Sequence, residues 1–390
     1  MSIRFLTAGE SHGPALVVIL EGMPSGLTLD INTINHELER RQTGYGAGGR
    51  MKIEHDQVRI LSGVLEGKTI GSPLALLIEN VDHAKWQNKP IPPMTIPRPG
   101  HADLSATIKY GYSDLRPALE RASARETAAR VAMGAICKLF LNEFGIRVEG
   151  YVRAIGEIEA DLSTIPLEKR FQLAETSSVR CPEEISAKKM EERIRKVMEE
   201  KDTLGGVMEV VVFNPPAGLG SHVQWDRRLD ARLGAAVLSV PAIKGVEIGN
   251  AFQNASLPGT LAQDAIYREG EKLIRRSIRS GGIEGGISTG EPIIVRAAMK
   301  PIATTLTSQP SVDLLTGEQT ETKYERSDFC PVPRAVPIIE SMVAFIITDA
   351  LIEKIGGDSM QEMQERFQKL PQPKWKDIHL DGKEHTFWEA

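Results

Sequence analysis

Residues 114–145 read DLRPALERASARETAARVAMGAICKLFLNEFG and carry the signals of one long helix. Asp114 is a typical N-cap residue and Gly145 a typical helix stop, so we expect one long helix from about Arg116 to Phe144. The interior of this helix is rich in small residues, namely Ala118, Ala122, Ser123, Ala124, Ala128, Ala129, Ala132 and Ala135. Helices with such short side chains are usually buried against close neighbours, so the stretch predicts a helix inside the protein.

Strands and further helices are predicted before and after this helix. Apolar and β-branched runs predict strands at 3–7, 15–20, 207–213 and 292–298. Apolar residues at helical spacing predict helices that follow Asp30 and that span 183–200, 229–240 and 337–354. The 390 residues contain no repeat of solenoid length and no low-complexity linker. We therefore expect one large α+β or α/β unit, followed by a polar tail from Gly356.

The composition excludes several classes of function. A net charge of −5 argues against nucleic acid or an anionic membrane as a partner of the whole molecule. The longest apolar runs, such as 15–20, fall short of a transmembrane helix, and strand-like sequence from Ile3 leaves no room for a signal or transit peptide. The three cysteines (Cys137, Cys181 and Cys330) form no CxxC pair, which indicates a reducing cytoplasm and no zinc ribbon. We expect no metal site.

Residues 9–13, GESHG, match the G-x-S-x-G pattern of a serine hydrolase, with Ser11 as the nucleophile. That motif requires a strand before the serine and a helix after it, whereas Pro14 and the β-branched run 17–19 predict a second strand. A serine hydrolase is therefore a secondary hypothesis. The other alternative is a non-catalytic module that binds a flavin or a phosphate.

Histidine, arginine and aspartate recur in loops rich in glycine and proline. These segments are 9–13, 41–51, 98–104, 121–127, 281–286, 300–301 and 326–328. Glycine lets the backbone approach a ligand closely, and arginine matches the geometry of phosphate and carboxylate. Arg41 continues the apolar stripe of Ile34 and Leu38, so we expect it to point to the buried side and Arg40 to point elsewhere. The alternative is that Arg41 interacts with the last carbonyls of its helix. The pattern predicts a basic pocket for a small molecule with several negative charges.

These loops resemble those of the chorismate synthase family. The resemblance runs from Phe5 to about Ile355 and rests on the phrases TAGESHGP (7–14), RPGHADL (98–104), RASARET (121–127) and VQWDRRLDAR (223–232). It implies a shikimate-pathway lyase that converts 5-enolpyruvylshikimate 3-phosphate into chorismate and phosphate by trans-1,4 elimination. This reaction requires reduced FMN although it is redox-neutral overall.

The resemblance also implies an architecture. The expected fold is α+β, a β-α-β sandwich with alanine-rich helices buried between sheets, and the expected assembly is a homotetramer. Residues 1–355 would form one catalytic domain, and residues 356–390 a polar C-terminal tail.

The resemblance further implies roles for individual residues. His12 matches the proton donor to the departing phosphate, His101 the histidine beside the flavin, and Asp328 the carboxylate that handles the proton at flavin N5. The substrate-binding residues would be Arg41, Arg50, Arg98 and Arg125. The flavin-binding residues would be Arg121, Ala122, Ser123, Ala242, Gly285, Lys300, Pro301, Ile302, Ala303, Thr304 and Arg326. The histidines that match no motif are expected to be structural, at positions 36, 55, 83, 222, 379 and 385.

Two positions depart from the family pattern. Ala47 stands where the family usually has an arginine that contacts substrate or NADPH, so we do not expect firm NADPH binding. An external flavin reductase could then supply the reduced flavin. Phe329 stands where some members have proline, and we expect only a local change there.

Overall fold

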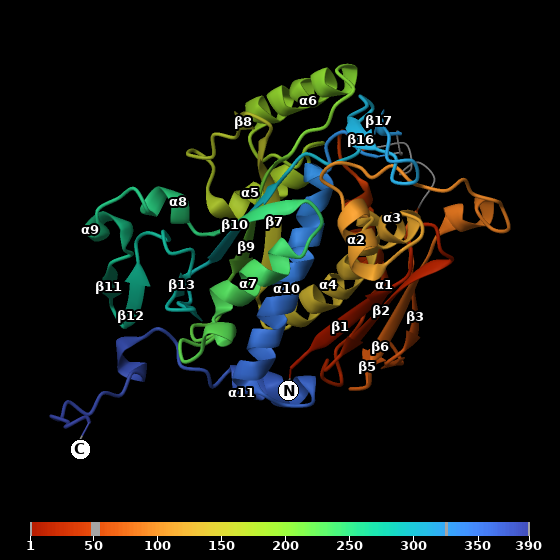
Figure 1. Cartoon of the computed structure of the whole chain (residues 1–390). Helices are drawn as coiled ribbons and strands as arrows, with labels where there is room; N and C mark the ends of the chain where they lie inside the picture. Colours follow the sequence, from red (N-terminus) through yellow and green to blue (C-terminus); the bar gives the residue numbers. More distant parts are fainter. Residues whose placement is uncertain (1, 48–54, 324–326, 389–390) are drawn as a thin grey trace.

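The computed structural model describes residues 2–47, 55–323 and 327–388. Two antiparallel sheets enclose a layer of helices (Figure 1). The first sheet has the strand order β1 (Arg4–Ala8), β2 (Ala15–Glu21), β6 (Leu74–Glu79) and β3 (Val58–Ser62). The second has the order β10 (Ile243–Ile248), β15 (Ile293–Met299), β9 (Gly206–Phe213), β7 (Arg147–Ile155) and β8 (Ile158–Glu159).

The helices of the middle layer are α1 (Ile31–Gln42), α4 (Thr127–Asn142), α7 (Leu229–Leu238) and α10 (Val332–Ile355). Helix α4 packs on β2 and β6 of the first sheet, and α10 packs on β7 and β9 of the second sheet and against α4. The two helices approach closely at Gly134, where an added Cβ would lie 2.5 Å from the Cα atom of Ser341. The predicted α+β sandwich with small-residue helices between two sheets is confirmed.

Shorter elements surround the sandwich. The outer helices are α2 (Asp103–Tyr110), α3 (Arg116–Arg121), α5 (Leu167–Glu175), α6 (Glu184–Glu199), α8 (Ala251–Asn254), α9 (Gly259–Ala262) and α11 (Met360–Phe367). Single 3-10 turns are η2 (Val81–Lys85), η3 (Ala124–Glu126), η4 (Trp225–Arg227) and η5 (Trp375–Asp377). Two-stranded hairpins join β4 (Val64–Leu65) to β5 (Lys68–Thr69), β11 (Ile266–Glu269) to β12 (Lys272–Arg275), β13 (Ile283–Glu284) to β14 (Ile287–Ser288), and β16 (Pro310–Val312) to β17 (Gln319–Glu321).

The expected continuous helix from Arg116 to Phe144 is wrong, because the chain breaks it near Ser123. Asp114 accepts a hydrogen bond from the backbone N–H of Arg116, but Leu115 rather than Asp114 occupies the N-cap position of α3, and α3 ends at Arg121. Ser123 has extended backbone angles (φ −63°, ψ 140°), and its hydroxyl accepts the N–H of Arg125. Serine competes in this way with helical hydrogen bonding and favours a new N-cap over a helix interior. The chain then continues through η3 into α4.

Helix α10 starts five residues earlier than expected, at Val332, and contains Pro337. It is long and apolar enough to cross a membrane, contrary to the expectation that every apolar stretch is too short. Most of its length is buried inside the protein, however, between the second sheet and helices α4 and α7. Helix α10 therefore serves as a core helix of the sandwich.

Arg40 differs from its prediction, because it is buried as deeply as Arg41. Its guanidinium group donates to the carboxylates of Glu340 (2.7 Å), Glu37 (2.8 Å) and Glu175 (2.9 Å). The carboxylate of Glu340 also pairs with Lys138 and is fully buried. This cluster connects α1 to α4 and α10, so Arg40 has a structural role.

Candidate active site

The Gly9–Gly13 loop joins β1 to β2 and carries His12 at one edge of the first sheet. Asn80, at the end of β6, holds this loop by donating to the carbonyls of Glu10 (3.1 Å) and Gly13 (2.8 Å). The serine-hydrolase elbow is not formed, because strand β2 rather than a helix follows the loop. Ser11 is buried, and its hydroxyl accepts a hydrogen bond from Ser123 (3.2 Å). The loop geometry therefore does not support Ser11 as a hydrolase nucleophile.

The His12 ring lies between a carboxylate and an indole. Its Nδ1 atom is 2.8 Å from Oε1 of Glu120, in α3, and its ring centroid is 4.7 Å from that of Trp86. A cavity of about 270 Å³ opens beside these three residues. His83, which no motif had singled out, also lines this cavity and contacts the carbonyl of His12 through Nδ1 (2.9 Å).

Two buried arginines from different elements share one carboxylate. Arg41, at the end of α1, and Arg125, in η3, both donate to the buried Asp56, at 3.2 and 2.6 Å. Arg41 also donates to Thr127 (3.0 Å), and Arg125 to Asn80 (2.8 Å), which connects this group to the His12 loop. Arg41 thus points to the buried side as predicted.

The Arg41 guanidinium group lies in an unfavourable environment for a cation. Burial lowers the pKa of Arg41 to about 9; Asp56 opposes this effect, while Arg334 and Arg125 add to it. The alternative role of Arg41 at the helix end is taken by other residues, since Arg180 and Arg334 donate to the carbonyls of Arg40 and Arg41. A further anion at this place would relieve the excess of positive charge.

Arg98 and His101 form a second group, in the loop that leads into α2. Both contact the fully buried Asp103: Nε of Arg98 donates to Oδ2 (2.8 Å), and Nδ1 of His101 lies 2.6 Å from Oδ1. Burial alone would raise the pKa of Asp103, but the hydrogen bonds from His101 and Arg98 outweigh it and lower the pKa far below its usual value. Arg98 also donates to the Thr304 hydroxyl (3.3 Å).

Asp328 connects the group of Arg41 and Arg125 with the group of Arg98 and His101. It forms an ion pair with Arg334, whose Nε donates to the carbonyl of Arg41 (3.0 Å). The hydroxyl of the preceding Ser327 donates to the carbonyl of Thr304 (3.2 Å). His12, His101, Asp328, Arg41, Arg98 and Arg125 are therefore joined by a continuous set of contacts, whereas Arg50 and Arg326 lie outside the described residues.

Most of the remaining predicted residues border this network. Arg121 donates to the carbonyls of Thr7 (2.9 Å) and Gly9 (3.2 Å), next to Ala122 and Ser123. Ala242 adopts a left-handed backbone (φ +67°), and its carbonyl accepts the N–H of Lys300 (2.9 Å). The segment Lys300, Pro301, Ile302, Ala303 and Thr304 passes close to the Arg98 loop, since a Cβ added at Gly100 would lie 3.4 Å from Lys300 Nζ.

Gly285 is placed differently from the other predicted flavin residues. It lies in the β13–β14 hairpin, whose Gly286 accepts the N–H of Leu229 at the start of α7. Ala242 follows the other end of α7, about 15 Å along a helix of ten residues. Within one chain, Gly285 is thus not brought to the same place as Ala242.

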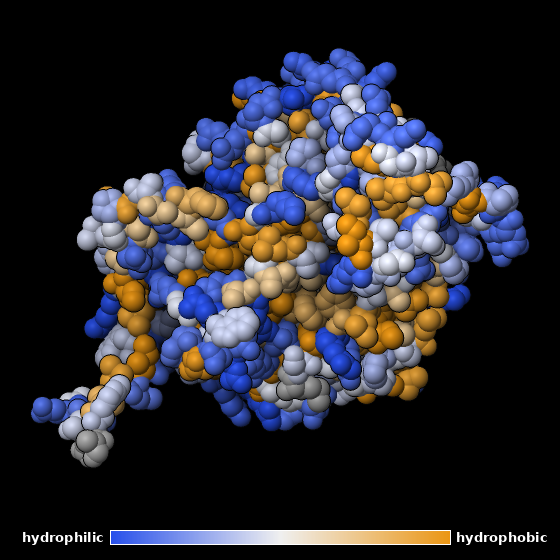
Figure 2. Space-filling model, in the orientation of Figure 1, coloured by the Kyte–Doolittle hydropathy of each residue, from blue (hydrophilic) through white to orange (hydrophobic). Residues whose placement is uncertain are grey.

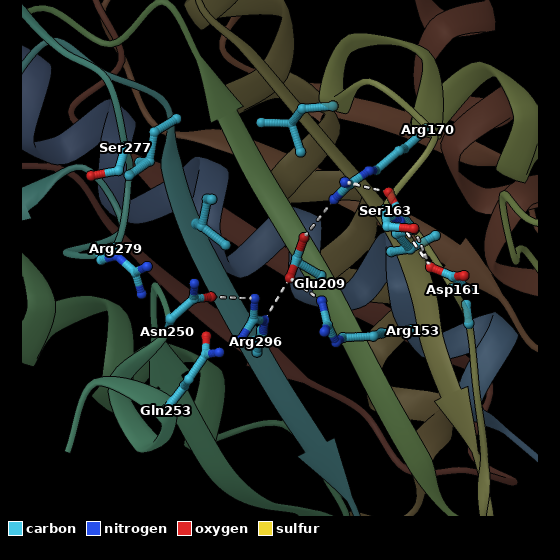
Figure 3. A pocket seen from close by; sticks show the side chains of 15 residues that line it. Arg153, Asp161, Ser163, Arg170, Glu209, Asn250, Gln253, Ser277, Arg279 and Arg296 are labelled. Atoms are coloured by element: carbon cyan, nitrogen blue, oxygen red, sulfur yellow. Dashed lines mark hydrogen bonds and ion pairs between the residues drawn. The ribbon is translucent and has the colours of Figure 1, made fainter. Parts of the chain in front are cut away.

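A second cavity, of about 750 Å³, lies on the face of the second sheet opposite α10 (Figure 3). Its floor holds the buried Glu209, which accepts from Arg296 (2.5 Å), Arg153 (3.4 Å) and Tyr151. Arg170 donates to the carbonyls of Ile165 and Leu162 and to Tyr151. The guanidinium groups of Arg153, Arg170 and Arg296 already have protein partners. We therefore interpret the ion pairs at the base of this cavity as structural.

Sequence reasoning missed several residues of the site. Asp56, Asn80, Glu120, Trp86 and Arg334 each contact a predicted site residue. None of them lies in a loop that combines glycine with basic residues, so no local pattern pointed to them. Within the described ranges, no group of three histidine, cysteine or acidic residues is arranged to hold a metal ion.

The arrangement suits the recognition and protonation of an anion. Buried guanidinium groups provide fixed positive charge, and two histidines that each contact a carboxylate can give up or accept protons. Comparisons with known proteins agree with this chemistry. The family model described as chorismate synthase matches residues 3–352.

Two curated relatives and one solved structure illustrate the similarity. The chorismate synthase of Desulforudis audaxviator is 50% identical over 372 residues, covering 93% of this chain and 95% of that protein. The chorismate synthase of Aquifex aeolicus is 50% identical over 384 residues, covering 94% and 96%. A crystal structure of chorismate synthase is 44% identical, with a TM-score of 0.77, and covers 94% of this chain and 97% of its own.

Proposed function

The chain belongs to the chorismate synthase family, and from that premise we propose which of its residues carry out the family's reaction. The enzyme is a lyase of the shikimate pathway that converts 5-enolpyruvylshikimate 3-phosphate into chorismate and phosphate. The hypotheses of a serine hydrolase and of a non-catalytic binding module are set aside. The proposals below concern residue roles, cofactor and assembly.

The shared contact of Arg41 and Arg125 with Asp56 is the observation that carries the site assignment. Two buried cations with one carboxylate between them favour the arrival of a further anion. We assign Arg41, Arg98 and Arg125 to the phosphate and carboxylates of the substrate, together with Arg50 from outside the described residues. In a water-poor site these fixed charges act more strongly than they would in water.

The proton transfers are assigned to three groups. His12, beside the cavity of about 270 Å³, gives a proton to the phosphate as it leaves. His101 is held through Nδ1 by Asp103 and stands next to the flavin segment through Arg98 and Thr304. Asp328, paired with Arg334, accepts the proton that the second half of the elimination releases.

The family uses reduced flavin, and we propose that the flavin here is FMN. The residues near the network fit such a group: Lys300 is partly buried, and burial followed by the positive charge of Lys244 lowers its pKa, so an anionic group would stabilise it. The holding residues would be Arg121, Ala122, Ser123, Ala242, Gly285, Lys300, Pro301, Ile302, Ala303, Thr304 and Arg326. Reduced FMN, when bound, supplies the electron density that the elimination needs.

We do not assign a firm NADPH site to this chain. Ala47 replaces the arginine that the family usually places in this glycine loop, and the next residues lie outside the described part of the chain. An external flavin reductase is the partner that would keep FMN reduced.

A homotetramer in the cytoplasm is the proposed assembly. The outer face of the first sheet supports it, because Leu6 (66% exposed) on β1 lies opposite Ile19 (42%) on β2, and Leu61 (51%) is exposed on β3 at the other edge of the sheet. Figure 2 shows hydrophobic side chains gathered over this sheet. Exposed apolar patches of this kind mark interfaces. The glycine at 285 could reach a flavin only from a neighbouring subunit if Ala242 binds the same molecule.

We propose residues 1–355 as the catalytic domain and 356–390 as a tail. The start of this tail is packed: the N–H of Met360 donates to the carbonyl of Ser25 (2.8 Å), and Met363 is buried. The first part of the tail therefore packs against the N-terminal part of the chain, and the rest extends away from the body of the protein (Figure 1).

An anaerobic assay tests the proposed function. The enzyme is mixed with 5-enolpyruvylshikimate 3-phosphate and FMN reduced by dithionite, and chorismate and phosphate are measured together. Equal amounts of both products, over many turnovers for each reduction, are expected. Turnover with oxidised FMN and no reductant would contradict the cofactor assignment, and FMN binding without any phosphate release would contradict the assigned chemistry.

A further inference from the structure

We propose that Glu120 is a positioning residue for His12: its carboxylate binds the Nδ1 proton and so reserves Nε2 as the atom that protonates the leaving phosphate. This inference rests on the proposed role of His12 as the proton donor. It adds a residue that no motif pointed to, and it states which nitrogen of the ring does the chemistry.

Glu120 holds the histidine at two points. One carboxylate oxygen lies 2.8 Å from Nδ1 of His12, and the other accepts the backbone N–H of the same residue, also at 2.8 Å. The backbone carbonyl of Glu120 accepts the N–H of Ser11 (3.2 Å). Because both the ring and its backbone are bound by one side chain, the imidazole cannot turn without losing a contact.

The surroundings make this orientation stable. The side chains of His12 and Glu120 are only 20% and 14% exposed, so water competes weakly for their hydrogen bond. The indole of Trp86 covers one face of the ring at 4.7 Å between centroids. The other titratable groups at the cavity are Glu10, from the same loop, and His83, which contacts the carbonyl of His12.

The charge on Glu120 decides which tautomer is stable. Burial works against its ionised form, but the hydrogen bonds from the ring and backbone of His12 outweigh burial and lower the pKa of Glu120. An ionised carboxylate has only acceptors, so Nδ1 must carry a proton and Nε2 faces away from Glu120.

In the protonation step, the Nε2–H bond of the imidazolium breaks while an O–H bond forms on the phosphate oxygen. The N–H electron pair stays on Nε2, and the ring is left neutral with its Nδ1 proton still donated to Glu120. Solvent then returns a proton to Nε2.

Glu120→Gln gives a sharp test because it keeps the shape and reverses the hydrogen bonding. The backbone N–H of His12 still needs an acceptor, and the amide oxygen of the glutamine takes that place. The amide NH₂ group is then turned toward Nδ1, which must become the acceptor. The variant should therefore hold neutral His12 in the opposite tautomer, with the proton on Nε2, and should disfavour the imidazolium.

The tautomer is measured by solid-state NMR of the enzyme labelled with ¹⁵N-histidine, with the His12 signals assigned by their loss in His12→Ala. At a pH where His12 is neutral, the wild type should show a protonated Nδ1, and Glu120→Gln a protonated Nε2. A protonated Nε2 in the neutral wild type would overturn the positioning role, whatever the kinetics show.

Kinetics provide the second readout. Glu120→Gln should lower kcat about 10²- to 10³-fold, within the range for lost proton transfer and below the ~10⁴-fold known for a reversed tautomer in serine proteases. KM should change less than about threefold, and the alkaline limb of the kcat–pH profile should move to lower pH. The matched control is Glu168→Gln, an exposed carboxylate in α5, which should keep wild-type kcat.

The double variant separates this inference from the function it rests on. If Glu120 acts through His12, Glu120→Gln should cost nothing further in a His12→Ala background. A kcat for Glu120→Gln within threefold of wild type, with His12→Ala strongly impaired, would overturn the role of Glu120 alone. Full activity in His12→Ala would overturn the role of His12, and that of Glu120 with it.

Discussion

Asp56→Asn should destabilise the folded protein strongly and make its stability depend on added anions. The Asp56 side chain is 1% exposed and accepts from Arg125 at 2.6 Å and from Arg41 at 3.2 Å. Asparagine has nearly the same shape but no charge, and its NH₂ group would face a guanidinium donor. The substitution therefore leaves two buried cations without their shared counterion.

The magnitude follows from the charges. A pair of unit charges about 4 Å apart contributes about 4 kcal/mol at an effective dielectric constant of 20. Burial already lowers the pKa of Arg41 to about 9, with Asp56 opposing the effect and Arg334 and Arg125 adding to it. Removing one partner of a buried ion pair typically costs about 3–5 kcal/mol, and we expect a loss of unfolding free energy in this range.

Urea unfolding monitored by tryptophan fluorescence measures this loss, in chloride buffer at pH 7 and a fixed subunit concentration. Asp358→Asn, which changes an exposed carboxylate, is the control and should lie within about 0.5 kcal/mol of wild type. Adding inorganic phosphate should restore part of the stability of Asp56→Asn, because an anion that binds only the folded state stabilises it by mass action. A loss below about 1 kcal/mol, or no recovery in phosphate, would refute the reasoning.

Three further predictions concern catalysis, affinity and packing. His12→Ala and His101→Ala should each fold normally and lower kcat about 10²- to 10⁴-fold in the anaerobic assay; near-full activity from pH 6 to 8 would remove the assigned role. Ala47→Arg should lower KM about tenfold, with a larger effect at low salt, since a charge-assisted hydrogen bond contributes about 1.5–3 kcal/mol; an unchanged KM at low ionic strength would show that another cation fills this place. Gly134→Ala should lower the free energy of unfolding in urea by about 1–3 kcal/mol, because the new Cβ would lie 2.5 Å from the Cα of Ser341. An unfolding midpoint equal to that of the wild type would contradict this packing.

The elements that sequence predicted well are those fixed by local patterns. Alternating burial places Leu16, Val18 and Leu20 of β2 in the core, and Asp30 caps α1 through the N–H of Asn32. The helix break at Ser123 was missed because alanine and serine are compatible with a helix locally. The Ser123 hydroxyl caps the next turn through the N–H of Arg125 and also contacts Ser11, which is distant in sequence, and the second contact cannot be read from the local pattern.

The site was predictable as a set of motifs but not as a network. The motif residues His12, Arg41 and Arg125 were identified from their loops, whereas the carboxylates that hold them were not. Asp56 lies five residues beyond the loop 41–51, and Glu120 lies one residue before the phrase 121–127, so neither belongs to a quoted motif; their importance comes from long-range contacts. Local spacing carries no information about such pairings.

The helix break at Ser123 also separates the contacts of Arg121 from those of Arg125, which is useful for protein engineering. In an unbroken helix, Arg121 and Arg125 would be four residues apart on the same face and would change together. Here Arg121 contacts the backbone of Thr7 and Gly9, while Arg125 reaches Asp56 and Asn80. A library that randomises the residues before the break could select for an altered flavin, and a second library after it for an altered substrate. Gains at Arg121 and Arg125 should combine nearly additively because these two side chains contact different neighbours, whereas changes at Glu126 should couple to the first library through Thr7.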